Sequence, residues 1–95
     1  MRIIKRKPLL EFAGIHPGVR SSLESWYRIV KHTDYKSFAD LRKTFPSADP
    51  VEGFTVFNIG GNKARLITVI HYKSKIVYIR HILTHEESDR GSWKG

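Results

Sequence analysis

A chain of 95 residues is long enough for one folded domain, so we expect residues 1–95 to form a single domain. Seventeen Lys and Arg residues against nine Asp and Glu residues give a formal net charge of +8, which favours nucleic acid as a partner, although excess charge can also serve solubility alone. The chain has no cysteine, which excludes disulfides and thiolate metal sites, and no apolar run of the roughly 20 residues that a transmembrane helix needs. The basic N-terminus lacks the apolar segment of a secretory signal, which predicts a cytoplasmic protein.

The first half of the chain predicts a short strand followed by helices. Residues 2–5 read as a strand, and Pro8 suits the first turn of a helix that ends at His16-Pro17-Gly18. Ser37 can cap a further helix that Pro46 stops, and residues 46–50 are predicted to form a loop. Between these lies a helix whose apolar residues recur at amphipathic spacing, namely Val19, Leu23, Trp26, Tyr27 and Val30.

Beyond Gly53 the apolar period changes to two, which predicts three strands over residues 54–59, 64–72 and 76–83. Two-residue turns at Gly61-Asn62 and Lys73-Ser74 would join them into hairpins. The fold class is therefore α+β, with an N-terminal strand and two to three helices packed on a mainly antiparallel sheet. We expect His81 to fill the core face of this sheet, together with Phe57, Ile59, Leu66, Thr68, Ile70, Val77 and Ile79.

The same turn lengths predict a polar row on the other face of the sheet. Asn58 is expected opposite Arg65, and Arg80 opposite Ile67 on the next strand pair. Two arginines beside the glycine-rich turn would form a phosphate cradle, because guanidinium groups bind phosphate oxygens bidentately. Arginines on a solvent-facing sheet also pair with carboxylates, and this alternative stays open.

Two segments of the chain resemble the HigB family of type II toxins. One is Phe57-Asn58-Ile59-Gly60-Gly61-Asn62 followed by Arg65-Leu66, and the other is Thr84-His85-Glu86-Glu87-Ser88-Asp89. The start Arg2-Ile3-Ile4, the pair Trp26-Tyr27 and the run Phe45-Pro46-Ser47-Ala48-Asp49 are similar to the family as well, so the resemblance spans nearly the whole chain. It implies a RelE-like fold, cleavage of messenger RNA on the ribosome, and neutralisation by a cognate helix-turn-helix antitoxin of the HigA type.

The resemblance also carries individual site residues. Arg65 matches the family's strand arginine, Asn62 and Lys63 match its turn, and the segment from His85 to Asp89 matches its C-terminal segment. Ser88 stands where the family usually has tyrosine, and Arg90 where lysine is common. If that tyrosine stacks on a base or shares in proton transfer, this chain would be less active or would rely on His85 alone.

Metal-independent RNA cleavage uses the neighbouring 2′-hydroxyl as nucleophile, so the protein must move protons and stabilise a charged phosphorane. Fixed positive charge suits the second task, and the imidazole of His85 suits the first because it titrates near neutral pH. A nearby carboxylate would orient the imidazole or act as the base, and we expect no cofactor and no metal ion. The predicted catalytic residues are Arg65, Arg80, His85, Glu87 and Asp89, and the predicted RNA-binding residues are Asn58, Asn62, Lys63, Arg90 and Trp93.

Other interpretations of these segments remain open. Thr84 and Glu87 have the spacing of a helix capping box, in which His85 is an ordinary first-turn residue. Trp93 would stack on an RNA base or pack back on the sheet. The chain as a whole would alternatively be a non-catalytic RNA-binding module, or an interaction subunit whose basic face binds only an acidic antitoxin tail.

Overall fold

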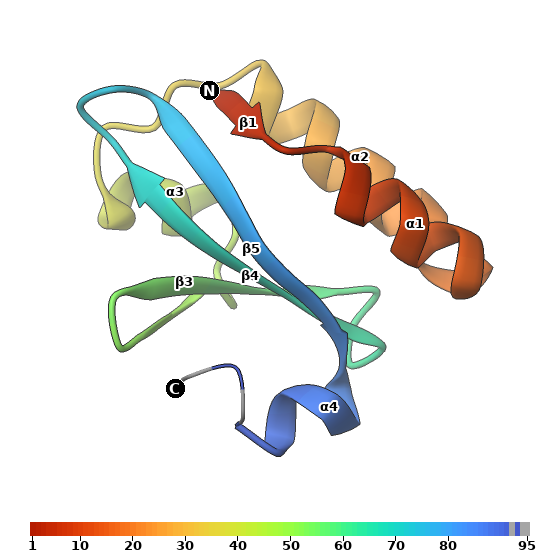
Figure 1. The fold of residues 1–95 in the computed structure, drawn as a ribbon. Helices are drawn as coiled ribbons and strands as arrows, with labels where there is room; N and C mark the ends of the chain where they lie inside the picture. Colours follow the sequence, from red (N-terminus) through yellow and green to blue (C-terminus); the bar gives the residue numbers. More distant parts are fainter. Residues whose placement is uncertain (92, 94–95) are drawn as a thin grey trace.

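The computed structural model describes residues 1–91 and 93, which form helices packed on a five-stranded sheet (Figure 1). The strand order is β1-β5-β4-β3-β2, with β1 parallel to β5 and the other neighbours antiparallel. The predicted α+β class with an N-terminal strand is therefore confirmed. The elements are β1 (Arg2–Ile4), α1 (Lys7–Ile15), the 3₁₀-helix η1 (Pro17–Val19), α2 (Arg20–Lys31), α3 (Phe38–Thr44), β2 (Asp49–Val51), β3 (Phe54–Ile59), β4 (Ala64–His71), β5 (Ile76–Thr84) and α4 (His85–Asp89).

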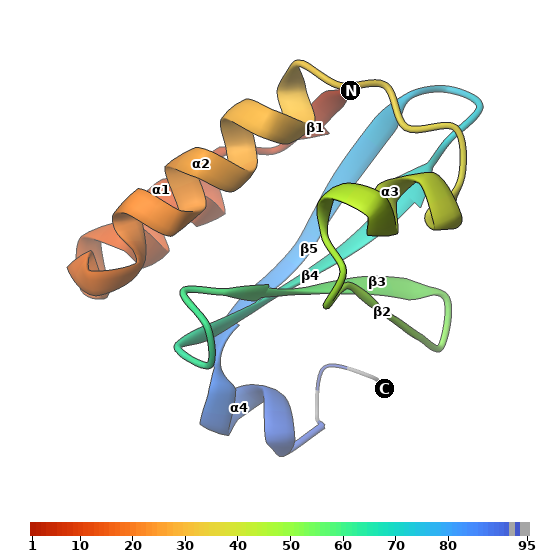
Figure 2. The ribbon, with the colours of Figure 1, turned by 180° about the vertical axis from the view of Figure 1, so that it is seen from behind.

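The three longer helices form where the sequence predicts them. Trp26 on α2 is buried and meets Phe57 of β3 edge to face, with the ring centroids 5.3 Å apart. The Ser37 side chain accepts a hydrogen bond from the Asp40 backbone and so caps α3, whose Leu41 is fully buried. In the two opposite views, α3 lies above β3 and α4 lies below it (Figures 1 and 2). Buried residues of α1, α2 and α3 join those of β3, β4 and β5 in one core.

The predicted loop over residues 46–50 is wrong in its last two residues. Asp49 and Pro50 belong to β2, which pairs with β3 across a two-residue turn at Glu52 and Gly53, both of positive φ. Pro50 is tolerated because β2 is an edge strand, in which the N–H groups that face away from β3 make no hydrogen bond within the sheet. Three residues are too few to show the alternation that marks longer strands.

The register between β3 and β4 agrees with the prediction, since Asn58 lies opposite Arg65. The register between β4 and β5 agrees as far as the pair Thr68 and Ile79 and then shifts by one residue, because Ile67 pairs with His81. Arg80 is therefore the extra residue of a β-bulge and does not lie opposite Ile67 as predicted.

The bulge also corrects the expected position of His81. Its side chain is exposed and lies on the face of the sheet opposite α1, α2 and α3, where it borders a hollow beside α4, so it does not fill the core. The predicted core face is otherwise confirmed, because Phe57, Leu66 and Val77 are buried against the helices. None of the described helices is long and apolar enough to cross a membrane.

Leu41→Ala should lower the free energy of unfolding by about 2–5 kcal/mol, because it leaves a cavity in a site that is 0% exposed. The matched control is Leu10→Ala on α1, where the side chain is 56% exposed and the expected change is within about 0.5 kcal/mol. Urea denaturation of the two variants measures the difference. Equal losses would contradict the placement of α3 in the core.

Candidate functional site

The short helix α4 begins where β5 ends, and a capping box fixes the junction. The Thr84 hydroxyl accepts from the backbone N–H of Glu87 at 3.2 Å, and a Glu87 carboxylate oxygen accepts from the backbone N–H of Thr84 at 3.0 Å. The backbone hydrogen bond from Thr84 lowers the pKa of the Glu87 carboxyl. The carboxylate of Glu87, a predicted catalytic residue, is therefore engaged in holding the start of α4.

The capped helix brings His85 onto Arg65 of β4. Arg65 Nη2 lies 2.8 Å from His85 Nε2, and His85 Nδ1 lies 3.2 Å from Asp89 Oδ2 one turn further along α4. Because a guanidinium group can only donate, the neutral imidazole accepts at Nε2 and donates from Nδ1 to Asp89. Three predicted catalytic residues thus form one line of hydrogen bonds, which we call the Arg65–His85–Asp89 line.

The Arg65 guanidinium also carries a buried donor. Its Nε atom is shielded from solvent and has no hydrogen-bond partner among the described residues. A buried N–H without an acceptor costs about 1–3 kcal/mol, so such groups in a native protein call for an explanation. A phosphate oxygen is the kind of acceptor that a guanidinium binds most strongly.

The other predicted site residues lie on several elements. Asn58 pairs in register with Arg65, while Asn62 and Lys63 lie in the exposed turn between β3 and β4. The Lys63 ammonium group lies beside Gly18 of η1 and lines a hollow formed by α1 and η1, not the region around the line. Arg80 is exposed in the bulge, with its guanidinium carbon 5.4 Å from the centre of the Tyr78 ring.

Two predicted RNA-binding residues, Arg90 and Trp93, follow the end of α4. Arg90 pairs with Glu86 at 3.4 Å on the exposed side of α4. Trp93 donates from its indole N–H to the Ser88 carbonyl at 3.1 Å, and its ring meets Phe54 of β3 edge to face at 5.5 Å. Trp93 therefore packs back on the sheet, which was one of the two alternatives, and its ring also borders the hollows beside α4, so that its predicted role in RNA binding stays a prediction.

One of these hollows adjoins the Arg65–His85–Asp89 line. It has a volume of about 220 Å³ and lies between α4 and the face of the sheet that the longer helices leave uncovered. We call it the Ser88 cavity, and its lining residues are Asp49, Val51, Val56, Arg65, Ser88, Asp89 and Trp93. Sequence reasoning did not single out Asp49, because it placed this residue in a loop and not on β2.

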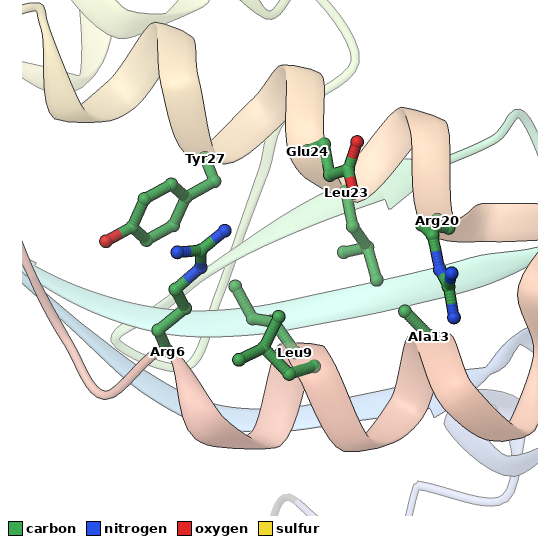
Figure 3. A pocket seen from close by; sticks show the side chains of 8 residues that line it. Arg6, Leu9, Ala13, Arg20, Leu23, Glu24 and Tyr27 are labelled. Carbon is green, nitrogen blue, oxygen red and sulfur yellow. The ribbon is translucent and has the colours of Figure 1, made fainter.

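A separate hollow lies between α1 and α2 (Figure 3). The Arg6 guanidinium covers the Tyr27 ring at one end, 4.5 Å from its centre, and Leu9, Ala13 and Leu23 supply apolar surface. None of the predicted site residues lines it. Among the described residues there is no group of three or more His, Cys, Asp or Glu side chains placed to hold a metal ion.

Comparison with known proteins places the sequence among bacterial toxins. Residues 19–91 match the family model HigB toxin, described as the RelE-like toxic component of a toxin–antitoxin system. A protein of Escherichia coli O6:H1 named mRNA interferase HigB is 33% identical over 93 residues, which cover 95% of this chain and 90% of that protein. The mRNA interferase toxin HigB of Escherichia coli K12 and the mRNA interferase HigB of Shigella flexneri are each 30% identical over 92 residues, covering 94% of this chain and 88% of each relative.

Thr84→Ala should lower the free energy of unfolding by about 1 kcal/mol, because the N-cap hydrogen bond of α4 is lost. Urea denaturation of the variant and of the wild type measures the difference.

Glu87→Gln should also destabilise the protein at neutral pH. Since the folded-state pKa of Glu87 is lowered, its contribution is present above its unfolded pKa and disappears as the pH falls through the folded value. Denaturation of wild type and Glu87→Gln should therefore differ at neutral pH and converge in acid, and a constant difference would contradict the capping role.

Proposed function

Because the chain belongs to the HigB toxin family, the RelE-like toxic components of toxin–antitoxin systems, we propose that it is an endoribonuclease that cleaves messenger RNA and thereby inhibits translation. The observation that carries this proposal is the Arg65–His85–Asp89 line. It joins a proton acceptor to a fixed positive charge, and RNA cleavage by the 2′-hydroxyl needs both. The names of the relatives, mRNA interferases, support the same substrate.

In this mechanism Asp89 orients the imidazole of His85 and stabilises its protonated form. When the scissile phosphate arrives, the Arg65 guanidinium donates to the phosphate oxygens, and His85 Nε2 is released to accept the proton of the 2′-hydroxyl. The 2′-oxygen then bonds to phosphorus, and the bond from phosphorus to the 5′-oxygen breaks as that oxygen takes up a proton from water. His85 afterwards returns its proton to the solvent. The products are a 2′,3′-cyclic phosphate and a 5′-hydroxyl.

The remaining predicted residues are assigned to binding and structure. Lys63, Arg80 and Arg90 supply positive charge and contact the RNA backbone. Asn58 and Asn62 add hydrogen-bonding groups near Arg65. Glu87 serves α4 through the capping box. A protein of this charge fits cleavage of ribosome-bound mRNA in the cytoplasm, with a helix-turn-helix antitoxin of the HigA type as the neutralising partner.

A non-catalytic RNA-binding module is the second candidate, and one observation favours it. Ser88 is 7% exposed and stands where the family usually has tyrosine, so this position brings no aromatic ring to the site. Such a module would keep the positive charge and the fold without turning over RNA. Measuring the cleavage rate and RNA affinity of the same variants separates the two candidates.

Arg65→Ala and His85→Ala should each lower the cleavage rate by about a hundredfold or more, because each side chain acts in the transition state. Arg80→Ala should cost less than about tenfold, since a phosphate contact at the rim is shared with its neighbours. His81→Ala is the matched control, an exposed histidine on the same face, and should leave the rate unchanged.

Single-turnover cleavage of ribosome-bound mRNA, with detection of the 2′,3′-cyclic phosphate, measures these rates. Circular dichroism checks that each variant is folded. If His85→Ala cleaves at the parental rate, the assignment of the base is wrong.

Affinity for RNA should fall steeply as salt is raised, because a protein of net charge +8 releases condensed counterions when it binds phosphates. Lys63→Ala should weaken binding modestly and reduce the slope of log K against log salt by about 1. Fluorescence anisotropy with a labelled RNA over a salt series gives the slope. A flat dependence would show that the positive charge does not contact the backbone.

A further inference from the structure

The Ser88 cavity has a chemistry that the cleavage mechanism does not use. It shares Arg65 and Asp89 with the Arg65–His85–Asp89 line, so it opens directly beside the position of the scissile phosphate. Its volume of about 220 Å³ is several times the ~30 Å³ that one water occupies in the liquid. The small side chain of Ser88 leaves this space open. A group attached to the nucleotide at the cleaved bond can therefore enter it.

The cavity is lined mainly by polar groups, and its aromatic wall is the ring of Trp93. Val51 and Val56, on neighbouring strands, add only a small apolar area. The Trp93 ring is fixed in orientation by its hydrogen bond to the Ser88 carbonyl and by its contact with Phe54. Unpaired RNA bases bind proteins by stacking on such aromatic side chains, and this stacking tolerates any base.

The edge of the cavity is selective because it carries a carboxylate. Asp49 lies opposite Val56 in the register of β2 and β3, and its side chain is exposed to an incoming ligand. An ionised carboxylate only accepts hydrogen bonds. Adenine, cytosine and guanine each present an exocyclic amino group that donates, and uracil has none.

We propose that the Ser88 cavity binds the nucleobase next to the cleaved phosphate, stacked on Trp93, and that Asp49 selects bases with an exocyclic amino group. The proposal rests on the proposed function, because it is the RNA substrate that brings a base to this position. It adds a specificity-determining residue that belongs to an edge strand and takes no part in the chemistry.

Four short RNAs that differ only in the base at the cleavage position test this proposal. Each carries a 2′-deoxy substitution there, so that binding is measured without cleavage. Wild type should bind the three amino-bearing RNAs about tenfold more tightly than the uracil RNA, as expected for a base-specific hydrogen bond. Asp49→Asn should reduce this preference to less than about threefold, because its amide donates as well as accepts.

The matched control is Glu11→Gln, which removes the same charge from an exposed site on α1 and should leave the preference unchanged. Trp93→Ala should weaken all four RNAs by about tenfold, and Trp93→Phe should restore most of the affinity, since stacking does not depend on the base. The role of Asp49 is overturned if the Asp49→Asn variant keeps the base preference, or if the wild type binds all four RNAs equally. Unchanged affinity in Trp93→Ala overturns the stacking.

Cleavage of the corresponding all-ribose messages on ribosomes separates this proposal from the enzymatic one. Messages cleaved at equal rates whatever the base, with no binding preference, would reject the base pocket and leave the endoribonuclease intact. A binding preference that depends on Asp49, without any cleavage, would support the pocket and reject the enzyme.

Discussion

The hydrogen bond between Arg65 and His85 is the contact on which the candidate site depends. It joins the middle of the sheet to a helix of only five residues, so neither partner could be placed by its own element alone. The capping box at Thr84 sets the direction in which α4 leaves β5. Asp89 then falls on the same side of the helix as His85, because residues four apart are neighbours on a helix surface.

A second constraint is that the two faces of the sheet pack against different parts of the chain. The longer helices cover one face of the sheet (Figures 1 and 2). They supply the core, in which Trp26 and Leu41 cluster with Phe57 and Leu66. The other face buries Val56 and Ile67 and is partly covered by α4 and Trp93. Most of the hydrophobic core lies on the helix side, and the buried donor Arg65 Nε lies on the other side, where it can bind a ligand.

Local signals predicted most of the elements, and long-range contacts account for what was not predicted. The cap at Ser37, the amphipathic stripe of α2 and the register of Asn58 with Arg65 all follow from nearby residues. The edge strand β2 was missed because it is short and contains proline. The fold-back of Trp93 onto Phe54 and the meeting of Arg65 with His85 join residues far apart in the chain, which spacing alone does not reveal.

The bulge at Arg80 shows that core packing overrides the strict alternation of side chains along β5. The bulge also affects the candidate site. If the register of Thr68 with Ile79 continued without a bulge, His81 would face the core opposite Leu66, and Ile82 would face outward opposite Arg65. With it, Ile82 packs towards the core and the imidazole stays in solvent, which avoids burying a polar ring. The apolar residues Val77, Ile79 and Ile82 already carry this break in their spacing. The shifted phase brings Thr84 opposite Ala64 at the end of β5, and from that position α4 directs His85 onto Arg65.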